Sequence, residues 1–417
     1  MRIGLQAPRK KGGGAETFEQ ELFEGLLAAV HEHPHTLVIF SKHPRPADLA
    51  NGDQIKWIRV GSVGWRNLAA NAKRLINWGL NHLFHLPSPF RNEHWIDAYL
   101  HDQQIEFFLN LVPETTPTEV PYMVFIWDLM HRILPFFPEC SQRGAWVRRE
   151  ARLGQMIRRA AIVGVGTETG KQEVMRFYQV PENRIQVLPF PTPRFALEAG
   201  SSLTPAQTSI AGKIGGEYVF FPANFHAHKN HATLLHAIAI LRDRHGVILQ
   251  AALSGEDWGN LAHVKEMIGR LGLGRQVHFM GFVSREQLIG LYRGALALVF
   301  PSLLGPDNIP PLEAFGLGCP AIVADIPGAE EQMHGAALLF PPTDESALAE
   351  AILKVHKDRE FRESLIVQGR MRARQFSSQD VGQATLRIIG EFEGIRRCWA
   401  SGDHYPSRYN VARLFGE

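Results

Sequence analysis

One stretch, Val299 to Gly328, constrains the fold of this chain more than any other. It opens inside the apolar run 295–300, which predicts a strand buried on both faces. A polar loop follows at 301–308, and after it come a helix-like LEAFGLG and a second apolar strand, AIVAD. Strand, loop, helix and strand in this order predict a βαβ unit, whose ligands bind at the carboxyl ends of the strands.

The helix of this unit begins at the loop, so we expect its first N–H groups and its positive dipole end to face an anion. Glu313 lies one turn into the helix and would face the same crevice. A carboxylate there can accept hydrogen bonds from a ribose diol. The alternative is an ordinary crossover in which Glu313 only favours the helix start.

The pattern resembles the signature of retaining glycosyltransferases of family 4, which have the GT-B fold. Those enzymes show a Glu, seven residues and a second Glu before a Gly-Cys-Pro or Gly-x-Pro turn. Here the second Glu is Glu313 and the turn is Gly318-Cys319-Pro320, while Gly305 occupies the first Glu position. A branch of the family that reads roughly GPTNxPPLEA, with many mannosyltransferases, has the same glycine.

Composition places the chain among ordinary globular proteins. Its 417 residues suit two domains of about 200 residues each. The net charge of +2 gives no argument for nucleic acid as a partner. Three widely spaced cysteines fit a reducing compartment, so we expect a cytoplasmic protein. The sequence shows no signal-peptide pattern and no run of eighteen apolar residues, so we expect no membrane span.

Strands and helices alternate in both halves, which predicts an α/β protein with two Rossmann-like, doubly wound domains facing a cleft. The segment 192–211 is rich in Pro, Ser, Thr and Ala and reads as the linker. By resemblance, residues 1–200 would bind the acceptor and 201–395 the nucleotide sugar. We expect the tail, 396–417, to return to the first domain.

Several loops of the expected cleft carry further candidate residues. A first strand is followed by Gly12, Gly13 and Gly14, which do not match a dinucleotide-binding motif. The resemblance implies that this loop faces the donor diphosphate, and a plain tight turn is the alternative. Lys229 precedes a helix in the second half, where a cation and helix N–H groups can clamp a phosphate together.

The surroundings of Lys229 carry both a departure from the family pattern and two histidines. Family members usually have an Arg five residues before this Lys, and here the position is Asn224. His226 and His228 are spaced like metal ligands. They have no carboxylate partner nearby in sequence, so we interpret them as loop residues that touch phosphate.

Two more donor contacts follow from the resemblance. The turn Gly281-Phe282-Val283 would hold the nucleobase through backbone groups. The amides around Asn308 and Ile309 would hold the sugar or the diphosphate. Ser284, with Gln287 three residues later, predicts a helix N-terminus.

On the acceptor side, the strand VPYMVFIWDLMH ends at Asp128. Many family members have a His-Asp pair here, whereas this chain has Trp127 before Asp128 and keeps the later His131. Asp128 and His131 are candidates for positioning the acceptor hydroxyl or taking its proton. The alternative for His131 is a structural loop histidine.

Two basic segments raise the question of a membrane surface. Residues 61–92 combine Arg and Lys with Trp and Phe and lack Asp and Glu, and residues 143–159 hold six arginines against one Glu. Both suit peripheral contact with an anionic membrane or a lipid-linked acceptor. Solvated helix faces are the alternative.

The resulting hypothesis is a retaining glycosyltransferase that moves a hexose, with GDP-mannose as the first candidate donor and UDP-sugars as the others. The acceptor would be a saccharide or lipid-linked saccharide in polysaccharide or glycan synthesis. The sequence has no Asp-x-Asp motif, so we expect no essential metal and no cofactor. The alternatives are a non-catalytic nucleotide-sugar-binding protein and a GT-B sugar-nucleotide epimerase.

Overall fold

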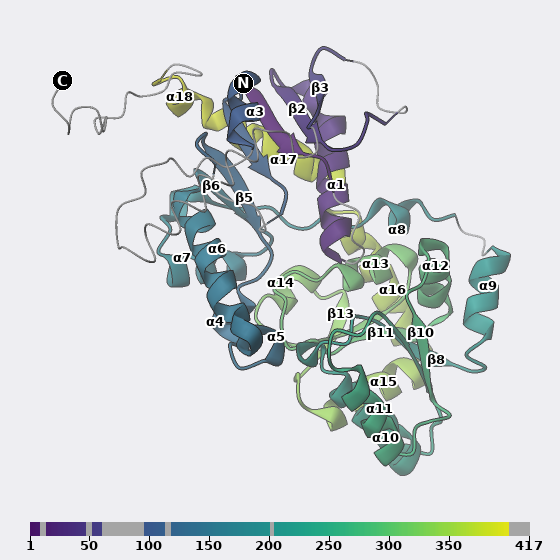
Figure 1. Ribbon diagram of the computed structural model, residues 1–417. Helices are drawn as coiled ribbons and strands as arrows, with labels where there is room; N and C mark the ends of the chain where they lie inside the picture. The colour runs from purple at the N-terminus through teal and green to yellow at the C-terminus, as the bar shows by residue number, and fades with distance from the viewer. Residues whose placement is uncertain (9–13, 47–51, 61–95, 113–117, 201–203, 400–417) are drawn as a thin grey trace, which may run out of the picture.

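The computed structural model describes residues 1–8, 14–46, 52–60, 96–112, 118–200 and 204–399. Two domains, each built on one parallel sheet, lie one above the other in Figure 1. The predicted α/β fold with two Rossmann-like domains is therefore confirmed. The predicted linker falls between the last strand of the first sheet and the first strand of the second.

The first domain has a seven-stranded sheet in which every pair of neighbouring strands is parallel. β4 and β5 are buried at every residue, as expected for strands covered on both faces. In spatial order the strands are β3 (Ile55–Arg59), β2 (Thr36–Ser41), β1 (Arg2–Gln6), β4 (Phe107–Asn110), β5 (Tyr122–Ile126), β6 (Ile162–Val165) and β7 (Ile185–Val187).

Helices of the first domain connect these strands and cover the sheet. α1 buries Phe18, Leu22, Leu26 and Ala29, the apolar face that its periodicity predicts. The described helices are α1 (Gly14–Ala29), α3 (Asp97–Asp102), α4 (Met130–Ile133), α5 (Pro138–Ser141), α6 (Ala145–Arg159) and α7 (Glu168–Tyr178), with 3₁₀ turns η1 (Val30–Glu32), η2 (Gln142–Gly144) and η3 (Glu182–Arg184).

The second domain has a six-stranded, all-parallel sheet. The two strands of the central βαβ unit, β11 and β12, are adjacent and fully buried, as the sequence predicts. The spatial order is β10 (Val277–Gly281), β9 (Gln250–Ser254), β8 (Tyr218–Pro222), β11 (Ala297–Phe300), β12 (Ala321–Ala324) and β13 (Ala337–Phe340).

One helix of the second half starts where its capping residues predict. Ser284 and Gln287 form the expected capping box at the start of α12. The elements are α8 (Arg194–Glu198), α9 (Pro205–Gly212), η4 (Ala227–Lys229), α10 (His231–His245), α11 (Leu261–Arg270), α12 (Arg285–Gly294), α13 (Ile309–Leu317), α14 (Ala329–Met333), α15 (Glu345–Lys357), α16 (Arg359–Ala373), α17 (Ser378–Glu391) and α18 (Glu393–Arg396).

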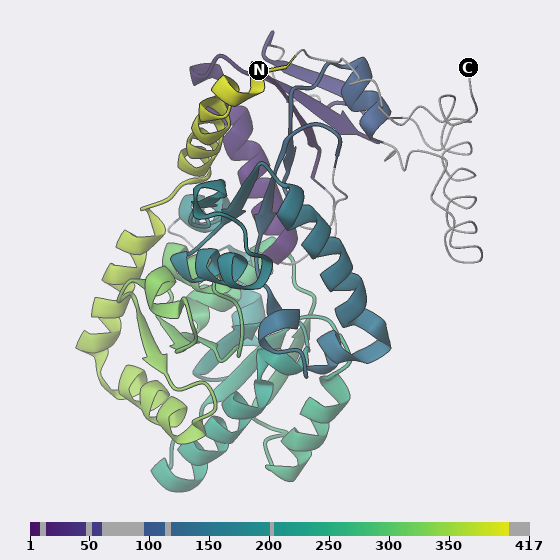
Figure 2. The same ribbon diagram turned by 90° about the vertical axis from the view of Figure 1, so that its left-hand side faces the viewer.

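The chain returns to the first domain at α17, upstream of residue 396, where we expected the return. Figure 2 shows the helices of the last third running up the side of the molecule from the second domain to the first. α17 packs directly on α1, because a Cβ on Gly25 would lie 1.9 Å from the Ser378 carbonyl oxygen. Ser378 Oγ also donates a 2.5 Å hydrogen bond to Glu21 Oε2. This helix pair ties the two domains together.

Candidate functional site

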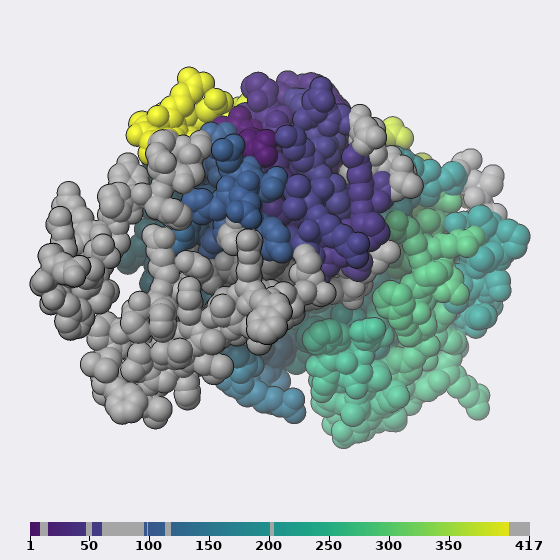
Figure 3. Space-filling model, turned by 45° about the horizontal axis from the view of Figure 1, so that its top comes forward, coloured from purple at the N-terminus to yellow at the C-terminus, as the bar shows by residue number. Residues whose placement is uncertain are grey.

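A cleft of about 1970 Å³ separates the two domains. The carboxyl ends of strands from both sheets line it, including Gln6, Ser41, Pro222 and Ser254. Parallel sheets bind ligands at this edge because loops and helix N-termini meet there. Figure 3 shows the first domain, in purple and blue, meeting the second, in green. The cleft is therefore the candidate functional site of the protein.

Glu313 lies on the second domain's wall of the cleft, on α13. Its Oε2 accepts a 2.6 Å hydrogen bond from Tyr292 Oη, and the residue is only 7% exposed. Burial raises the pKa of Glu313 to about 7, while Tyr292 and Arg285 lower it in part. The carboxyl group is thus fixed in position and has a pKa well above its ordinary value.

The start of α13 differs from the sequence-based expectation. The Asn308 amide donates a 2.9 Å hydrogen bond to Gln332 Oε1 and is therefore not directed to a ligand. Residues 310 and 311 are prolines, which lack an N–H group. Ile309 lines the cleft, so it is the first residue of α13 whose N–H can serve a substrate. Of the two amides predicted to hold the sugar or diphosphate, that of Asn308 is taken by Gln332, and the contact of Ile309 stays a prediction.

Gly305, which stands where related enzymes have a Glu, is required by the loop geometry. Its φ is +124°, a conformation that L side chains rarely adopt. A Cβ there would lie 2.5 Å from Asn308 Oδ1, and Asn308 Nδ2 donates a 2.6 Å hydrogen bond to the Gly305 carbonyl. A Glu could occupy this position only in a different loop conformation.

Lys229 lies in the cleft at the end of η4. Its ammonium is 3.4 Å from Ser302 Oγ and 5.1 Å from the Phe300 ring centroid. Burial lowers the pKa of Lys229 to about 8, against the opposing effect of Asp128 and Glu139. An anion bound beside it would favour the charged form. Lys229 is thus a partly buried cation in the cleft, and its contact with a phosphate stays a prediction.

The remaining donor-side candidates also line the cleft. Asn224 Oδ1 accepts a 2.9 Å hydrogen bond from the Glu256 amide, so this side chain shapes its loop. Gly281 has a φ of +65°, and Phe282, which follows it, is 72% exposed. With Val283, these residues form an open turn at the end of β10 that lines the cleft.

On the first domain's side, Asp128 lies in the cleft and His131 does not. Asp128 Oδ1 accepts hydrogen bonds from Arg149 Nη2, at 2.6 Å, and from the Met130 amide, at 2.8 Å. Burial raises the pKa of Asp128, but these partners outweigh it and lower the pKa below its ordinary value. Asp128 is therefore an ionised, positioned carboxylate.

His131 is fully buried, with Nε2 3.0 Å from Glu150 Oε2 and 3.2 Å from Tyr178 Oη. The Trp146 indole donates a 2.6 Å hydrogen bond to the His131 carbonyl. This placement corrects the predicted contact between His131 and an acceptor. The histidine supports the loop that carries Asp128.

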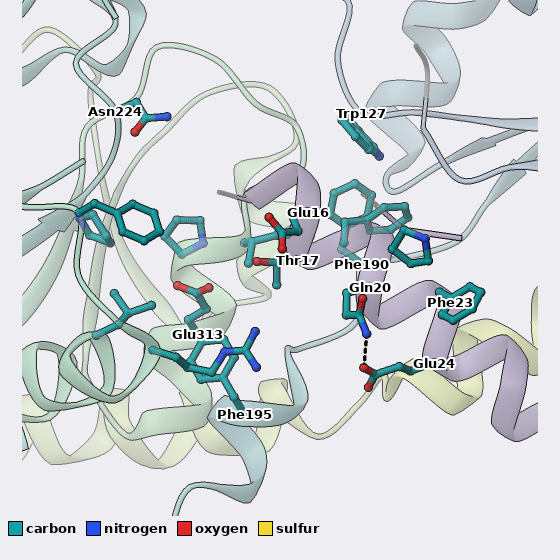
Figure 4. A pocket seen from close by; sticks show the side chains of 18 of the residues that line it. Glu16, Thr17, Gln20, Phe23, Glu24, Trp127, Phe190, Phe195, Asn224 and Glu313 are labelled. Carbon is teal, nitrogen blue, oxygen red and sulfur yellow. Dashed lines mark hydrogen bonds between the residues drawn. The ribbon is translucent and has the colours of Figure 1, made fainter. Parts of the chain in front are cut away.

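The glycine loop can be followed only in part. Gly12 and Gly13 lie outside the described residues, and Gly14 begins α1. The first turn of this helix places Glu16 and Thr17 in the cleft, where Figure 4 shows them beside Glu313. The helix therefore faces the second domain's site with polar groups that sequence reasoning did not select.

Tyr292, Gln332 and Glu139 were also not predicted. Tyr292 is hydrogen-bonded to Glu313, and Gln332 is hydrogen-bonded to Asn308. Nothing in the sequence around Tyr292 or Gln332 indicates these contacts. Glu139, on α5 of the first domain, is 2.5 Å from His228 Nδ1. The carboxylate partner that the two histidines lack in sequence is therefore supplied by the other domain.

The basic segments divide between the described and undescribed parts of the chain. Residues 61–92 lie outside the described residues. In the second segment Arg149 pairs with Asp128, while Arg148 and Arg152 are exposed. Among the helices that the structure describes, none has the length and apolar character needed to cross a bilayer.

Comparisons with known proteins agree with this architecture. The model of the family described as glycosyl transferases group 1 matches residues 209–372. The chain is 26% identical over 246 residues to the O-antigen chain mannosyltransferase B of Escherichia coli, which covers 57% of this chain. The chain spans 62% of that relative's length.

Solved structures match over nearly the whole chain. A sucrose-phosphate synthase from Thermosynechococcus elongatus has a TM-score of 0.69 at 18% identity, covering 94% of this chain and 99% of that one. Anabaena HepE in complex with UDP and glucose has a TM-score of 0.64 at 15% identity, covering 94% and 99%. The chain therefore has the GT-B fold, and its residues 209–372 match the model of the glycosyl transferases group 1 family.

Proposed function

We propose that this protein is a retaining glycosyltransferase that moves a hexose from a nucleoside diphosphate sugar to a saccharide or lipid-linked saccharide. One observation carries the proposal. A partly buried cation, Lys229, and a buried carboxyl group, Glu313, line the same interdomain cleft at the carboxyl ends of parallel strands. A nucleotide sugar carries the two matching groups, a diphosphate and a ribose diol.

Each group has a role in this reaction. Lys229 neutralises charge that develops on the leaving diphosphate, which stabilises the transition state more than the ground state. Glu313 accepts hydrogen bonds from the ribose, and the open turn Gly281-Phe282-Val283 holds the base. Asp128 faces the donor site from the first domain, where it positions the acceptor hydroxyl. We assign no side chain of the protein as a nucleophile in this transfer.

The donor is proposed to be a GDP- or UDP-sugar, with GDP-mannose first. The Escherichia coli relative is named as a mannosyltransferase, which supports mannose. The Anabaena structure contains UDP and glucose, which supports a nucleotide sugar in a cleft of this fold. Lys229 supplies positive charge at the diphosphate, so the transfer itself is expected to need no divalent metal.

The proposed location is the cytoplasm, with peripheral contact at the membrane where lipid-linked acceptors lie. The exposed arginines of α6, with the exposed apolar side chains of Phe136 and Val147 nearby in sequence, support this contact.

The test is turnover of a donor panel of GDP-mannose, UDP-glucose and dTDP-glucose, with and without saccharide acceptors. Release of nucleoside diphosphate, and transfer with the anomeric configuration kept, supports the proposal. Affinity without turnover would identify a non-catalytic binding protein. Conversion of the sugar without an acceptor would identify an epimerase.

A further inference from the structure

Three metal-ligating side chains from two domains meet at the edge of the cleft. His226 and His228 lie in the loop between β8 and α10, and Glu139 lies on α5, which Figure 1 shows reaching down to the second domain. One ligand atom of each lies within 4.8 Å of the other two. In sequence the carboxylate is 87 residues before the first histidine, so only the fold brings the set together.

The existing contacts leave part of this set without a partner. Glu139 Oε1 accepts from the His228 amide at 3.0 Å and lies 2.5 Å from His228 Nδ1. His226 Nδ1 is buried and has no hydrogen-bond partner among the described residues. Buried ring nitrogens normally have a hydrogen-bond partner. A ring nitrogen without one, in a cluster with a second imidazole and a carboxylate, therefore needs an explanation. The ion pair between Glu139 and His228 is not an explanation, because it leaves His226 Nδ1 without a partner among the described residues.

Neutral imidazole and ionised carboxylate are the forms in which histidine and glutamate bind a metal ion.

The space and the ligand type favour one class of ion. A cavity of about 340 Å³ is lined by all three side chains and by Asp128 and Cys140, which leaves room for water. Two imidazoles and one carboxylate are ligands of zinc and similar borderline ions, which take three protein ligands and keep a fourth position open. Magnesium prefers oxygen ligands in octahedral geometry.

We propose that Glu139, His226 and His228 form a binding site for a divalent transition metal of the zinc class, which bridges the two domains and takes water as its fourth ligand. Binding would break the hydrogen bond between Glu139 and His228, so that both groups become ligands, and would give the His226 ring a polar partner. It would act as an interdomain tie. The cavity also borders Lys229 and Asp128, to which the proposed function gives roles, so metal binding is tested by a measurement that does not use turnover.

The test uses the full-length protein after removal of metal with a chelator. Zn²⁺ and Co²⁺ are titrated by calorimetry, with the visible absorption of Co²⁺ as a second readout of its coordination. We expect one equivalent of Zn²⁺, a rise in the unfolding temperature and a spectrum typical of four-coordinate Co²⁺. Mg²⁺ should give neither heat nor stabilisation.

Variants separate this site from adventitious binding by other histidines and by the exposed Cys398. Glu139→Gln, His226→Gln and His228→Gln should each weaken Zn²⁺ binding at least about tenfold. His263→Gln removes an exposed histidine of the same domain and should bind as wild type. Circular dichroism checks that each variant is folded.

Failure of the wild type to bind one equivalent would overturn the proposal whatever the variants do. Binding that Glu139→Gln leaves unchanged would also overturn it, because the site would then not bridge the domains.

Discussion

Tyr292 Oη donates a 2.6 Å hydrogen bond to Glu313 Oε2, and both side chains are buried. The bond joins α12 to α13, so the turn after β10 and the carboxyl group at the cleft are parts of one rigid unit. The same phenol is 3.3 Å from the Pro310 carbonyl. The position of Glu313 is thus set by a residue that does not itself line the cleft.

Replacing Tyr292 with Phe removes this support without changing the packing of the ring. The hydrogen bond lowers the pKa of Glu313, so its loss raises that pKa further above its ordinary value. Nucleotide affinity should fall several-fold at pH 7 and recover in part at pH 8, and calorimetry measures both. The free energy of unfolding should fall by about 1–3 kcal/mol.

Tyr218→Phe is the matched control, because its hydroxyl is also buried and donates to the Leu291 carbonyl at 2.8 Å. It should lose stability but keep its nucleotide affinity. Equal losses of affinity in the two variants would contradict the role given to Tyr292.

Glu313→Gln should change stability in a pH-dependent way. The pKa of Glu313 is raised to about 7 by burial, so this group contributes stability below about pH 4.5 that is lost as the pH rises through 7. The loss is on the order of 3 kcal/mol. The variant should therefore be more stable than wild type at pH 8 but not at pH 5, as thermal unfolding can show. A difference independent of pH would count against a buried, titrating Glu313.

Lys229→Met should separate binding from stability. The pKa of Lys229 is lowered to about 8 by burial, so stability that is present above about pH 10.5 is lost as the pH falls to about 8. Methionine removes that cost, so the variant should be at least as stable as wild type at pH 7. Its turnover should fall by about 10²–10³-fold, because an electrostatic contact to the leaving group is lost.

Lys265→Met, at an exposed position of α11, controls for loss of charge and should keep full turnover. Retained turnover in Lys229→Met would remove Lys229 from the mechanism.

Gly166→Ala should hinder the approach of the two domains. Gly166 follows β6 in the first domain, and a Cβ there would lie 2.2 Å from Asp307 Oδ1 of the second. The contact is reinforced nearby by Glu331, which accepts a 2.5 Å hydrogen bond from the Glu168 amide across the interface. We expect lower turnover with little change in nucleotide affinity.

Gly269→Ala adds a methyl group where no atom lies within 4 Å and should behave as wild type. Small-angle scattering compares the compactness of the two variants. A Gly166→Ala protein with wild-type turnover and compactness would show that this contact does not matter for catalysis.

The fold was predictable because the periodicity of the hydrophobic residues is clear within short segments of the sequence. The buried runs of β11 and β12 and the apolar face of α1 lead directly to a parallel α/β architecture. Residues of the site were predictable only where they belong to a local sequence motif. Glu313 and Lys229 lie in such motifs and reach the cleft.

Contacts between segments distant in sequence were not predictable. Glu139 meets His228 across 89 positions, and Ser378 meets Glu21 across 357. The interpretation of His131 as a substrate contact failed for a related reason, since nothing in its own sequence shows that Glu150 and Tyr178 enclose it. Whether the tail beyond residue 399 contacts the first domain stays a prediction.

The most direct test of the central claim is thermal unfolding with UDP, GDP, dTDP and ADP, in wild type and in Glu313→Ala. A nucleotide at a hundred times its dissociation constant adds about 2.7 kcal/mol to stability. The account predicts that one nucleotide stabilises the wild type and that the effect collapses in the variant. No stabilisation by any of the four at millimolar concentration, or equal stabilisation of both proteins, would contradict a nucleotide-sugar site at Glu313.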